Sequence, residues 1–498
     1  MGKRTDSTGL GSLATGAVTA LALAVQTGLA AIVGVIIARD LGRTSETDGF
    51  FAAYGVFVVI LLMGNAIRVT MLPSFARART EGRLAAAVVS TALLVGSLAA
   101  LLVVIAIAAA EPIADLLTGQ GTELARSTAA DALPWMVAAG ALQVLAGLAA
   151  SALAALDDYV TAAVGFVSGS VAGLALILVL IDHHGVQAVA WGITLNGCIS
   201  LLVPSLVLVV RGRTAGLSVG KLRARRGGPA SSTLRLLLNG VALPLALQAI
   251  YLTCLPPASR EGEGAVTNLG YAYLFSSAVV AVTASSIGLV TAVPMTRAGL
   301  GEGRAARHIV ASAWLGVVAI GLTAGVLALG GGTLIGGLLG PSYASATGAE
   351  IGRLVVLLSP WAVATVGISV TYPLLFVHGR GWWLPILAVV VIGLQVPLAR
   401  LGQVTLGLDG IALSLAITTG LILVVMLTAL GSAKRVLSGL AAASAIVAAV
   451  ALVAFLPPWA LLDPVPGAVV GGMLFVAILA GFRPPPLLAA WRYLRALT

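Results

Sequence analysis

The chain has 498 residues, of which 59% are hydrophobic and only 9% are charged, and its formal net charge at pH 7 is +10. A soluble globular chain carries about 25% charged residues, so this composition excludes a protein whose whole surface faces water. The basic excess does not indicate a nucleic-acid partner, because the Lys and Arg residues are spread over many short loops.

Apolar runs of about 20 residues, long enough to cross a bilayer as helices, recur along the whole chain. They predict an all-α polytopic membrane protein with about 14 transmembrane helices. The first run is about 26 residues long, too long for the apolar core of a cleaved signal peptide, and is predicted to remain as a helix. The predicted helices cover 13–38, 50–72, 84–110, 129–154, 159–181, 187–210, 235–254, 266–293, 307–330, 352–376, 382–401, 408–431, 436–456 and 464–481.

The basic residues predict the orientation of these helices. With the N-terminus in the cytoplasm, 22 of the 28 Lys and Arg residues fall on the cytoplasmic side and 6 on the outside. This bias is the one that cytoplasmic loops of membrane proteins show. Both termini are therefore expected in the cytoplasm.

Two stretches of the chain repeat each other. The segment VTMLPSFARARTEGRLA (Val69–Ala85) shares seven of 17 positions with VTAVPMTRAGLGEGRAA (Val290–Ala306), at a constant offset of 221 residues. A second pair is PWMVA (Pro134–Ala138) and PWAVA (Pro360–Ala364). The offset carries a helix six helices onward, so both copies have the same orientation, as in a parallel internal repeat.

The repeat predicts the organisation of the chain: an N-lobe (1–211), a basic cytoplasmic linker (212–234), a C-lobe (235–431), and two further helices with a cytoplasmic tail (432–498). Duplicated lobes favour a substrate path at their interface and alternating access by lobe rocking. Duplication is also compatible with a channel or a membrane scaffold.

The repeated stretch itself has two interpretations. In each copy a proline, which lacks an amide proton, is expected to end or kink the helix, and a Glu-Gly-Arg turn then redirects the chain. The stretch is either a structural turn or a gate at the cytoplasmic mouth. The residues concerned are Pro73, Glu81, Arg83, Pro294, Glu302 and Arg304.

Polar side chains inside the predicted helices are candidates for a substrate cavity. Each amide can serve either as a cavity ligand or as a hydrogen-bonding contact between helices. Arg68 is the deepest cation, and it either binds cargo or reaches back to the membrane surface. Gly169 and Gly173 have the spacing of close helix packing. The amides are Gln26, Asn65, Gln143, Asn196, Asn239, Gln248 and Gln395.

The segment ARDLGRTSETDGFFAAY (Ala38–Tyr54) resembles the signature that joins the first two helices of lipid II flippases of the MurJ or MviN type. The helix endings LPSFARA and VPMTRA, and the layout of two six-helix lobes plus two helices, are also similar to that branch of the multidrug/oligosaccharidyl-lipid/polysaccharide (MOP) exporter superfamily or a close relative.

The resemblance implies a flippase of the bacterial-type cytoplasmic membrane. Its cargo would be a polyprenyl-pyrophosphate-linked sugar, either a lipid II-like peptidoglycan precursor or a polysaccharide unit, and its last two helices would form a groove for the polyprenyl tail. Membrane lipids and a coupling cation, Na⁺ or H⁺, are further expected partners.

The family's cavity arginines are missing here, because the first helix has no cation before Arg39 and GYAYLFSSAVV of the eighth has neither Asp nor Arg. Arg68 and Arg39 remain the charged candidates of the first lobe, with Asp48 placed to support Arg39.

Two other functions stay open: a cation-coupled multidrug antiporter of the same superfamily, and a non-transporting scaffold. The antiporter needs a titratable carboxylate within a helix. Asp131 comes closest to the middle of a predicted helix. No nucleotide-binding loop or catalytic triad appears, so we predict no enzyme activity and no cofactor. No metal site is predicted either, because Cys198 and Cys254 lie at different depths and His183 and His184 in a short loop.

Overall fold

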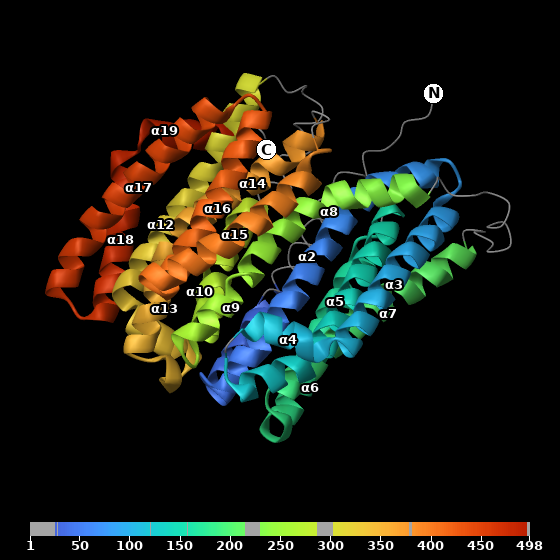
Figure 1. Cartoon of the computed structure of the whole chain (residues 1–498). Coiled ribbons are helices and arrows are strands. Elements are labelled where there is room, and N and C mark those ends of the chain that lie inside the picture. Colours follow the sequence, from blue (N-terminus) through green and yellow to red (C-terminus); the bar gives the residue numbers. More distant parts are fainter. Residues whose placement is uncertain are drawn as a thin grey trace. The chain divides into compact units, whose positions relative to one another are not determined.

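The structure of the protein is a computed structural model that describes residues 25–26, 28–119, 121–156, 158–214, 230–285, 302–377 and 381–495 (Figure 1). Within these ranges the chain is helical and contains no strand. In these described ranges twelve helices are long and apolar enough to cross a membrane, or thirteen if one bent pair of helices is counted as a span. The predicted all-α polytopic membrane class is confirmed. The predicted first helix lies largely outside the described residues; residues 28–36 are helical and continue into a π-helix, η1 (Ile37–Leu41).

Contacts divide the chain into two compact units, of which the first is Met1–Leu252. Its central helix is α5, which packs against α2, α3, α4 and α7. Small residues allow this close packing: a Cβ on Gly140 of α5 would lie 2.7 Å from the Cβ of Ile60 in α2. The helices are α2 (Ser45–Thr80), α3 (Leu84–Ala108), α4 (Ala110–Thr118), α5 (Glu123–Ala155), α6 (Val160–His184), α7 (Val186–Thr214) and α8 (Ala230–Leu252).

The predicted close packing at Gly169 and Gly173 is present between α6 and α7. A Cβ on Gly173 would lie 2.5 Å from the carbonyl oxygen of Gly192, and one on Gly169 would lie 2.6 Å from that of Asn196. Only a residue without a side chain allows two backbones to approach in this way.

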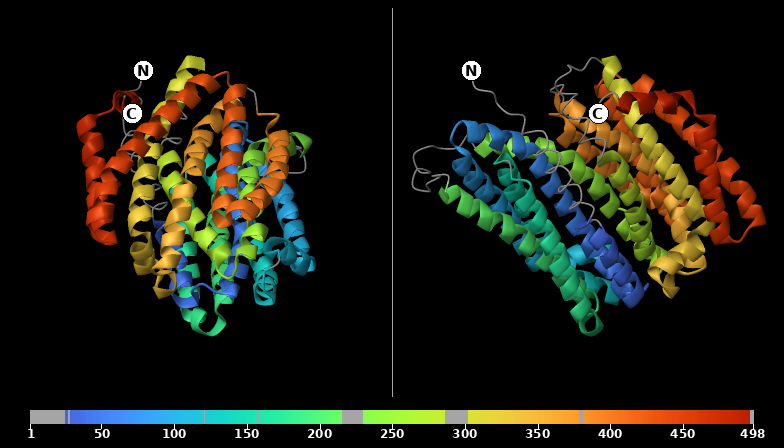
Figure 2. Two further views of the ribbon diagram at one scale, coloured as in Figure 1. Left: turned by 60° about the vertical axis from the view of Figure 1, so that its left-hand side comes forward. Right: turned by 180° about the vertical axis from the view of Figure 1, so that it is seen from behind.

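The second unit is Thr253–Thr498 and is built around α12. Figure 2 shows α17, α18 and α19 lying along this helix. A core cluster that includes Trp314, Val447 and Phe475 joins them. The helices are α9 (Leu255–Ala258), η3 (Ser259–Glu261), α10 (Ala265–Val280), η4 (Ala281–Ser285), α12 (Glu302–Leu339), η5 (Pro341–Tyr343), α13 (Ala346–Leu357), α14 (Ser359–Val377), α15 (Leu384–Leu406), α16 (Leu408–Ala429), α17 (Ala433–Leu461), α18 (Pro464–Phe482) and α19 (Pro485–Arg495).

One helix differs from the sequence-based prediction. The expected single helix 352–376 consists of α13 and α14, bent by 44°. Pro360, in the first turn of α14, has no amide proton to continue the hydrogen-bond ladder. The first compact unit ends at Leu252 and includes α8, which packs against α2.

Candidate functional site

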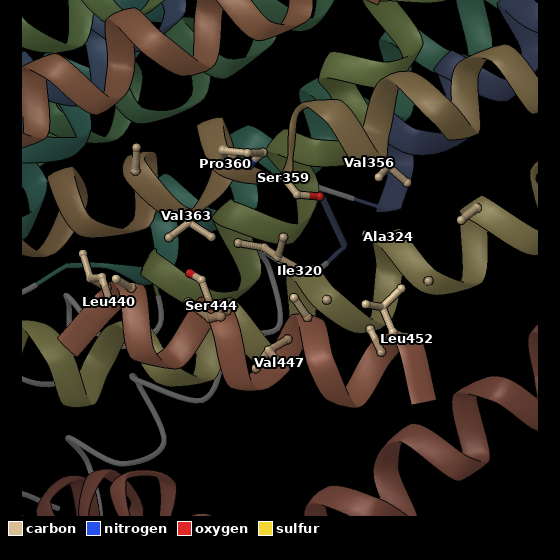
Figure 3. A pocket seen from close by; sticks show the side chains of 18 of the residues that line it. Ile320, Ala324, Val356, Ser359, Pro360, Val363, Leu440, Ser444, Val447 and Leu452 are labelled. Atoms are coloured by element: carbon tan, nitrogen blue, oxygen red, sulfur yellow. The ribbon is translucent and has the colours of Figure 1, made fainter. Parts of the chain in front are cut away.

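The second unit contains an apolar groove with a volume of about 980 Å³. Its walls are α12, α14, α16 and α17, together with Val356 of α13. Figure 3 shows Ile320 of α12 and Val363 of α14 facing Leu440 and Ser444 of α17 across this space. Of the last two predicted transmembrane helices, α17 forms one wall of this groove, and no described residue of α18 is among its lining residues.

Small residues on α12 make room for the groove. Gly321, Ala324, Gly325 and Ala328 follow one another at helical spacing on the lining face. At Gly325 the approach of α17 is close, because a Cβ there would lie 2.3 Å from the Phe455 ring. The space between these contacts and α16 stays open.

None of the described residues that line the groove is charged. Its lining hydroxyls are those of Ser359 and Ser444, and the Ser359 hydroxyl donates to the carbonyl oxygen of Val355 at 3.2 Å. Trp459, near one end of α17, is 67% exposed and adds an indole N–H at the rim. A phosphate would find no counter-charge here, whereas a long hydrocarbon chain would replace water along the whole surface.

Gly420 of α16 lines the groove and faces open space, because a Cβ built on it has no heavy atom within 4 Å. Gly393 of α15 has the same freedom but is not a lining residue. The two positions therefore allow a side chain to be added inside and outside the groove with equal ease.

The bend between α13 and α14 belongs to the groove wall. Val356 lies just before the bend, and Ser359 and Pro360 lie just after it (Figure 3). The shape of the groove thus depends on the angle between these two helices.

None of the sequence-predicted cavity residues whose side chains are described lines this groove. In the first unit, Arg39 is exposed on η1, whereas Asp48 is buried in the first turn of α2. The turn that carries Asp48 is fixed by a capping box between Thr44 and Thr47, and the Asp48 amide donates to the Thr44 carbonyl oxygen at 3.0 Å.

The predicted amides have different surroundings. Gln143 is buried in α5. Its main-chain carbonyl oxygen lies 3.5 Å from a Cβ built on Gly64 of α2, so the backbone at this position belongs to the contact between α5 and α2. Asn239 is half-buried on α8. Gln248, also on α8, is buried, and its Oε1 has no hydrogen-bond partner among the described residues.

Several predicted side chains lie outside the described part of the structure. They are those of Asn65, Arg68 and Pro73 in α2, those of Glu302 and Arg304 in α12, and all of Pro294. The backbone of α2 is helical as far as Thr80, so of the two expected effects of the first proline, an end or a kink of the helix, the end does not occur. A proline removes one ladder hydrogen bond, and the contacts of α2 with α5 and α8 keep the remaining turns helical.

The Glu-Gly-Arg segment forms a turn after α2. Gly82 has a φ of +66°, a left-handed conformation that glycine adopts without strain, and Arg83 pairs with Glu81. Nearby, Arg79 donates to the carbonyl oxygen of Ala155 at 2.7 Å and joins the ends of α2 and α5.

For Gln395 the structure favours the packing role. Its side chain is fully buried in α15, donates to Cys254 Sγ at 3.2 Å and to Ser414 Oγ at 3.0 Å, and accepts a hydrogen bond from Thr418. Both ends of the amide are therefore engaged within the second unit.

No protein-family model and no curated protein matches the sequence. Solved structures do match. One, described as lipid II flippase MurJ in an inward closed conformation, has a TM-score of 0.71 and 15% identity, and the match covers 93% of this chain and 98% of that chain. The chain has the fold of the MOP superfamily.

Two further matches support this assignment. An inward-facing multidrug resistance MATE family transporter of the MOP superfamily has a TM-score of 0.62 and 16% identity, over 84% of this chain and 95% of that chain. A MOP superfamily transporter from Pyrococcus furiosus has a TM-score of 0.57 and 16% identity, and the match covers 86% of this chain and 94% of that chain. At these identities the likeness concerns the fold, and cargo has to be argued from this chain's own residues.

Proposed function

We propose that the protein is a flippase that moves a polyprenyl-pyrophosphate-linked saccharide across a bacterial-type cytoplasmic membrane by alternating access. The observation that carries the proposal is the apolar groove of the second unit, about 980 Å³ in volume, whose described lining residues are all uncharged. A polyprenyl chain is a long hydrocarbon, and such a surface is complementary to it. The fold shared with a lipid II flippase supports the same class of cargo.

The pyrophosphate and the sugars require a second, polar site. In our proposal Arg68 and Arg39 supply positive charge, because an anionic head group in a low-dielectric cavity needs cations or directed donors. The amides of Asn65, Gln143, Asn239 and Gln248 are neutral donors for the same cargo. The turns after each proline, with Glu81, Arg83, Glu302 and Arg304, would then bound the cytoplasmic mouth.

A cation-coupled multidrug antiporter is the second candidate, and the likeness to MATE transporters favours it. An organic cation would be held best by carboxylates or by faces of aromatic rings. The groove contains no carboxylate, and its rings are those of Phe455 and Trp459. Aromatic rings alone can bind a cation, so it is the lack of a carboxylate among the described lining residues that disfavours an organic cation here.

The test is to fill the groove without disturbing the fold. Gly420→Leu places an isobutyl group inside the groove, and Gly393→Leu places the same group outside it. Both substitutions favour helix, so neither is expected to lower folded yield. Purified protein in vesicles is assayed for movement of a fluorescent polyprenyl-pyrophosphate disaccharide and of a fluorescent organic cation.

We expect Gly420→Leu to slow movement of the lipid-linked disaccharide on the order of tenfold, which corresponds to about 1.4 kcal/mol of lost binding, and Gly393→Leu to leave it unchanged. Equal rates for the two variants would show that the groove does not hold the cargo. Movement of the organic cation alone would favour the antiporter, and movement of neither compound by the unmodified protein would favour a scaffold.

A further inference from the structure

Three aromatic rings from three helices meet near one end of the first unit. The ring centre of Trp191, on α7, lies 6.3 Å from that of Trp135, on α5, and the two planes are 76° apart. The imidazole of His184, the last residue of α6, lies 5.1 Å from Trp191 between ring centres. The charge distribution predicts that this end of the unit faces the outside.

The backbones of α5 and α7 are closely joined at this level. The Thr194 hydroxyl of α7 lies 3.1 Å from the carbonyl oxygen of Trp135, within hydrogen-bond distance. Further along the same contact, a Cβ on Gly197 would lie 3.1 Å from the carbonyl oxygen of Ala139. The two tryptophans are therefore held on packed helices, so a ligand that binds there meets rings already in place.

Trp135 belongs to the one exposed stripe of α5. This helix is the centre of the unit, yet exposed residues recur on it every three or four positions, which places them on one face. Trp135 itself is 44% exposed. The stripe consists of Leu124, Ser127, Asp131 and Trp135.

Asp131 indicates that water reaches this stripe. An ionisable side chain on a membrane-spanning helix faces water or other protein groups and avoids hydrocarbon. Asp131 is exposed and lies one turn before Trp135, with no ion pair among the described residues. The arginine of the same helix, Arg126, is already paired with Asp115 and Glu123.

The residue types near the rings exclude a phosphate as their ligand. The sequence has no Lys or Arg from residue 127 to residue 210, which covers nearly all of α5, α6 and α7. The turn between α6 and α7 instead adds the exposed side chains of Asp182 and His183. These groups accept or donate hydrogen bonds without supplying the positive charge that a phosphate needs.

A saccharide matches this combination of groups. A sugar ring has a face of C–H groups, whose partial positive charge is attracted to the negative face of an aromatic ring. Its hydroxyls donate hydrogen bonds, and a carboxylate is the strongest acceptor for them. Trp135 and Asp131, four residues apart on one helix face, have Cβ atoms about 6 Å apart, so one sugar can contact both.

An organic cation is the other ligand for aromatic rings and a carboxylate, and the arrangement of the rings disfavours it. Rings hold a cation best when several of them enclose it. Here Trp191 is half-buried and packs edge-to-face with Trp135. The site therefore offers one open ring, that of Trp135, and no cage.

We propose that Trp135 and Asp131 form a binding site for an uncharged saccharide at the outer end of the first unit, with Trp191 and His184 supporting the Trp135 ring. The inference rests on the proposed function and deepens it. The site holds the sugar part of the cargo on the outer side of the membrane, and the positive charges that bind the pyrophosphate lie elsewhere in the chain.

The first experiment measures sugar binding without lipid, pyrophosphate or transport. The eight tryptophans are replaced biosynthetically by fluorotryptophan, and each fluorine NMR signal is assigned with a single Trp→Phe variant. The purified chain is then titrated with the free disaccharide at millimolar concentrations. We expect the signals of Trp135 and Trp191 to shift and saturate, while Trp382, which is 65% exposed in the second unit, stays unchanged.

Two pairs of variants connect the shifts to the site. Asp131→Asn should weaken disaccharide binding on the order of tenfold, because a charge-assisted hydrogen bond is lost, whereas Asp463→Asn, at an equally exposed aspartate, should have no effect. Trp135→Leu should weaken it on the order of tenfold or more and Trp382→Leu should not. Both tryptophans are exposed, so the fold does not depend on either ring.

Three results would overturn the proposal. The first is undiminished binding of the disaccharide to Trp135→Leu, and the second is an equal shift of the Trp382 signal. The third is a shift with tetraethylammonium and none with the disaccharide, which would make the rings a cation site. An absence of shifts with both compounds would leave the rings as anchors at the membrane surface and equally contradict a sugar site.

The second experiment connects the site to transport. Movement across vesicle membranes is compared for a fluorescent polyprenyl-pyrophosphate disaccharide and for the same lipid pyrophosphate without sugar. Trp135→Leu should slow the first compound on the order of tenfold and leave the second unchanged, since only the first has a sugar to bind. If the unmodified chain moves neither compound, the proposed function fails, while the NMR titration still decides whether the site binds sugar.

Discussion

The carboxylate of Asp158, at the turn between α5 and α6, lies 3.1 Å from the guanidinium of Arg211 near the end of α7. The same carboxylate accepts hydrogen bonds from the amide and the hydroxyl of Thr161, at 3.0 Å and 2.7 Å. One buried side chain therefore caps α6 and ties it to α7. The connection holds the ends of three consecutive helices in the first unit.

Removing this side chain should destabilise the first unit. Asp158→Ala leaves the Thr161 donors without their acceptor, and we expect a loss of about 1–3 kcal/mol in the free energy of unfolding. Most of this loss comes from the cap, because Arg211 is half exposed and its ion pair is screened by water. Thermal unfolding in detergent measures the change.

Asp158→Asn retains an acceptor for the Thr161 amide and should lose less. Arg126→Ala is the surface control: this arginine pairs with the exposed Asp115 and Glu123, and its removal should leave the unfolding midpoint nearly unchanged. Equal effects of Asp158→Ala and Arg126→Ala would contradict the capping role.

The Gln395 network predicts a similar contrast in the second unit. Gln395→Leu leaves the buried hydroxyls of Ser414 and Thr418 without the amide, at a cost of about 1–3 kcal/mol. Gln403→Leu removes an amide of the same kind from an exposed position and should cost little. If Gln395→Leu is as stable as the unmodified chain while Gln403→Leu is not, the network contributes no stability.

The charge distribution predicts which loops face outward. In a chain whose native cysteines are replaced, a cysteine at position 261 should react with an impermeant thiol reagent added to whole cells. A cysteine at position 223, in the predicted basic linker, should react only after the cells are opened. The reverse result would show that every helix has the opposite orientation in the membrane.

Arg68 distinguishes a cargo ligand from a cation that reaches the membrane surface. If it binds the pyrophosphate, Arg68→Ala removes a charge-assisted hydrogen bond of about 1.5–3 kcal/mol and slows lipid-linked saccharide transport on the order of tenfold or more. Arg68→Lys should recover part of the rate, because the charge remains and the planar guanidinium is lost. Transport normalised to folded protein gives the comparison, and a full rate in Arg68→Ala would exclude the ligand role.

Run length and hydrophobicity were sufficient to predict most of the fold. The expected helix 84–110 is Leu84–Ala108, and 408–431 is Leu408–Ala429. These elements depend on local composition, which a sequence displays directly. The bend after Leu357 could not be predicted in this way, because the Pro-Trp pair at Pro134 lies within the unbroken helix α5 while the pair at Pro360 follows a break.

The difference between the two prolines lies in their surroundings. The residues of α5 around Pro134 pack on several neighbouring helices, whereas α13 is drawn against the glycines of α12. Hydrogen bonds between side chains far apart in the sequence could not be predicted either. Glu350 and Asn268 are 82 residues apart, and no spacing rule joins them. The sequence contains one indication of the groove, because small residues recur along α12 at helical spacing. The same pattern, however, is also typical of close packing between helices.

Helix α12 has 38 residues, and at about 1.5 Å per residue it is about 57 Å long. Even at a steep tilt of about 40° it rises by about 44 Å, well above the hydrocarbon thickness of about 30 Å. Lipid tails therefore cannot cover its full length. At its N-terminal part the apolar residues Ala311 and Trp314 are covered by Leu487, Ala490 and Tyr493 of α19. The last helix of the chain thus packs on the N-terminal part of α12 and takes the place of lipid or water beside this long helix.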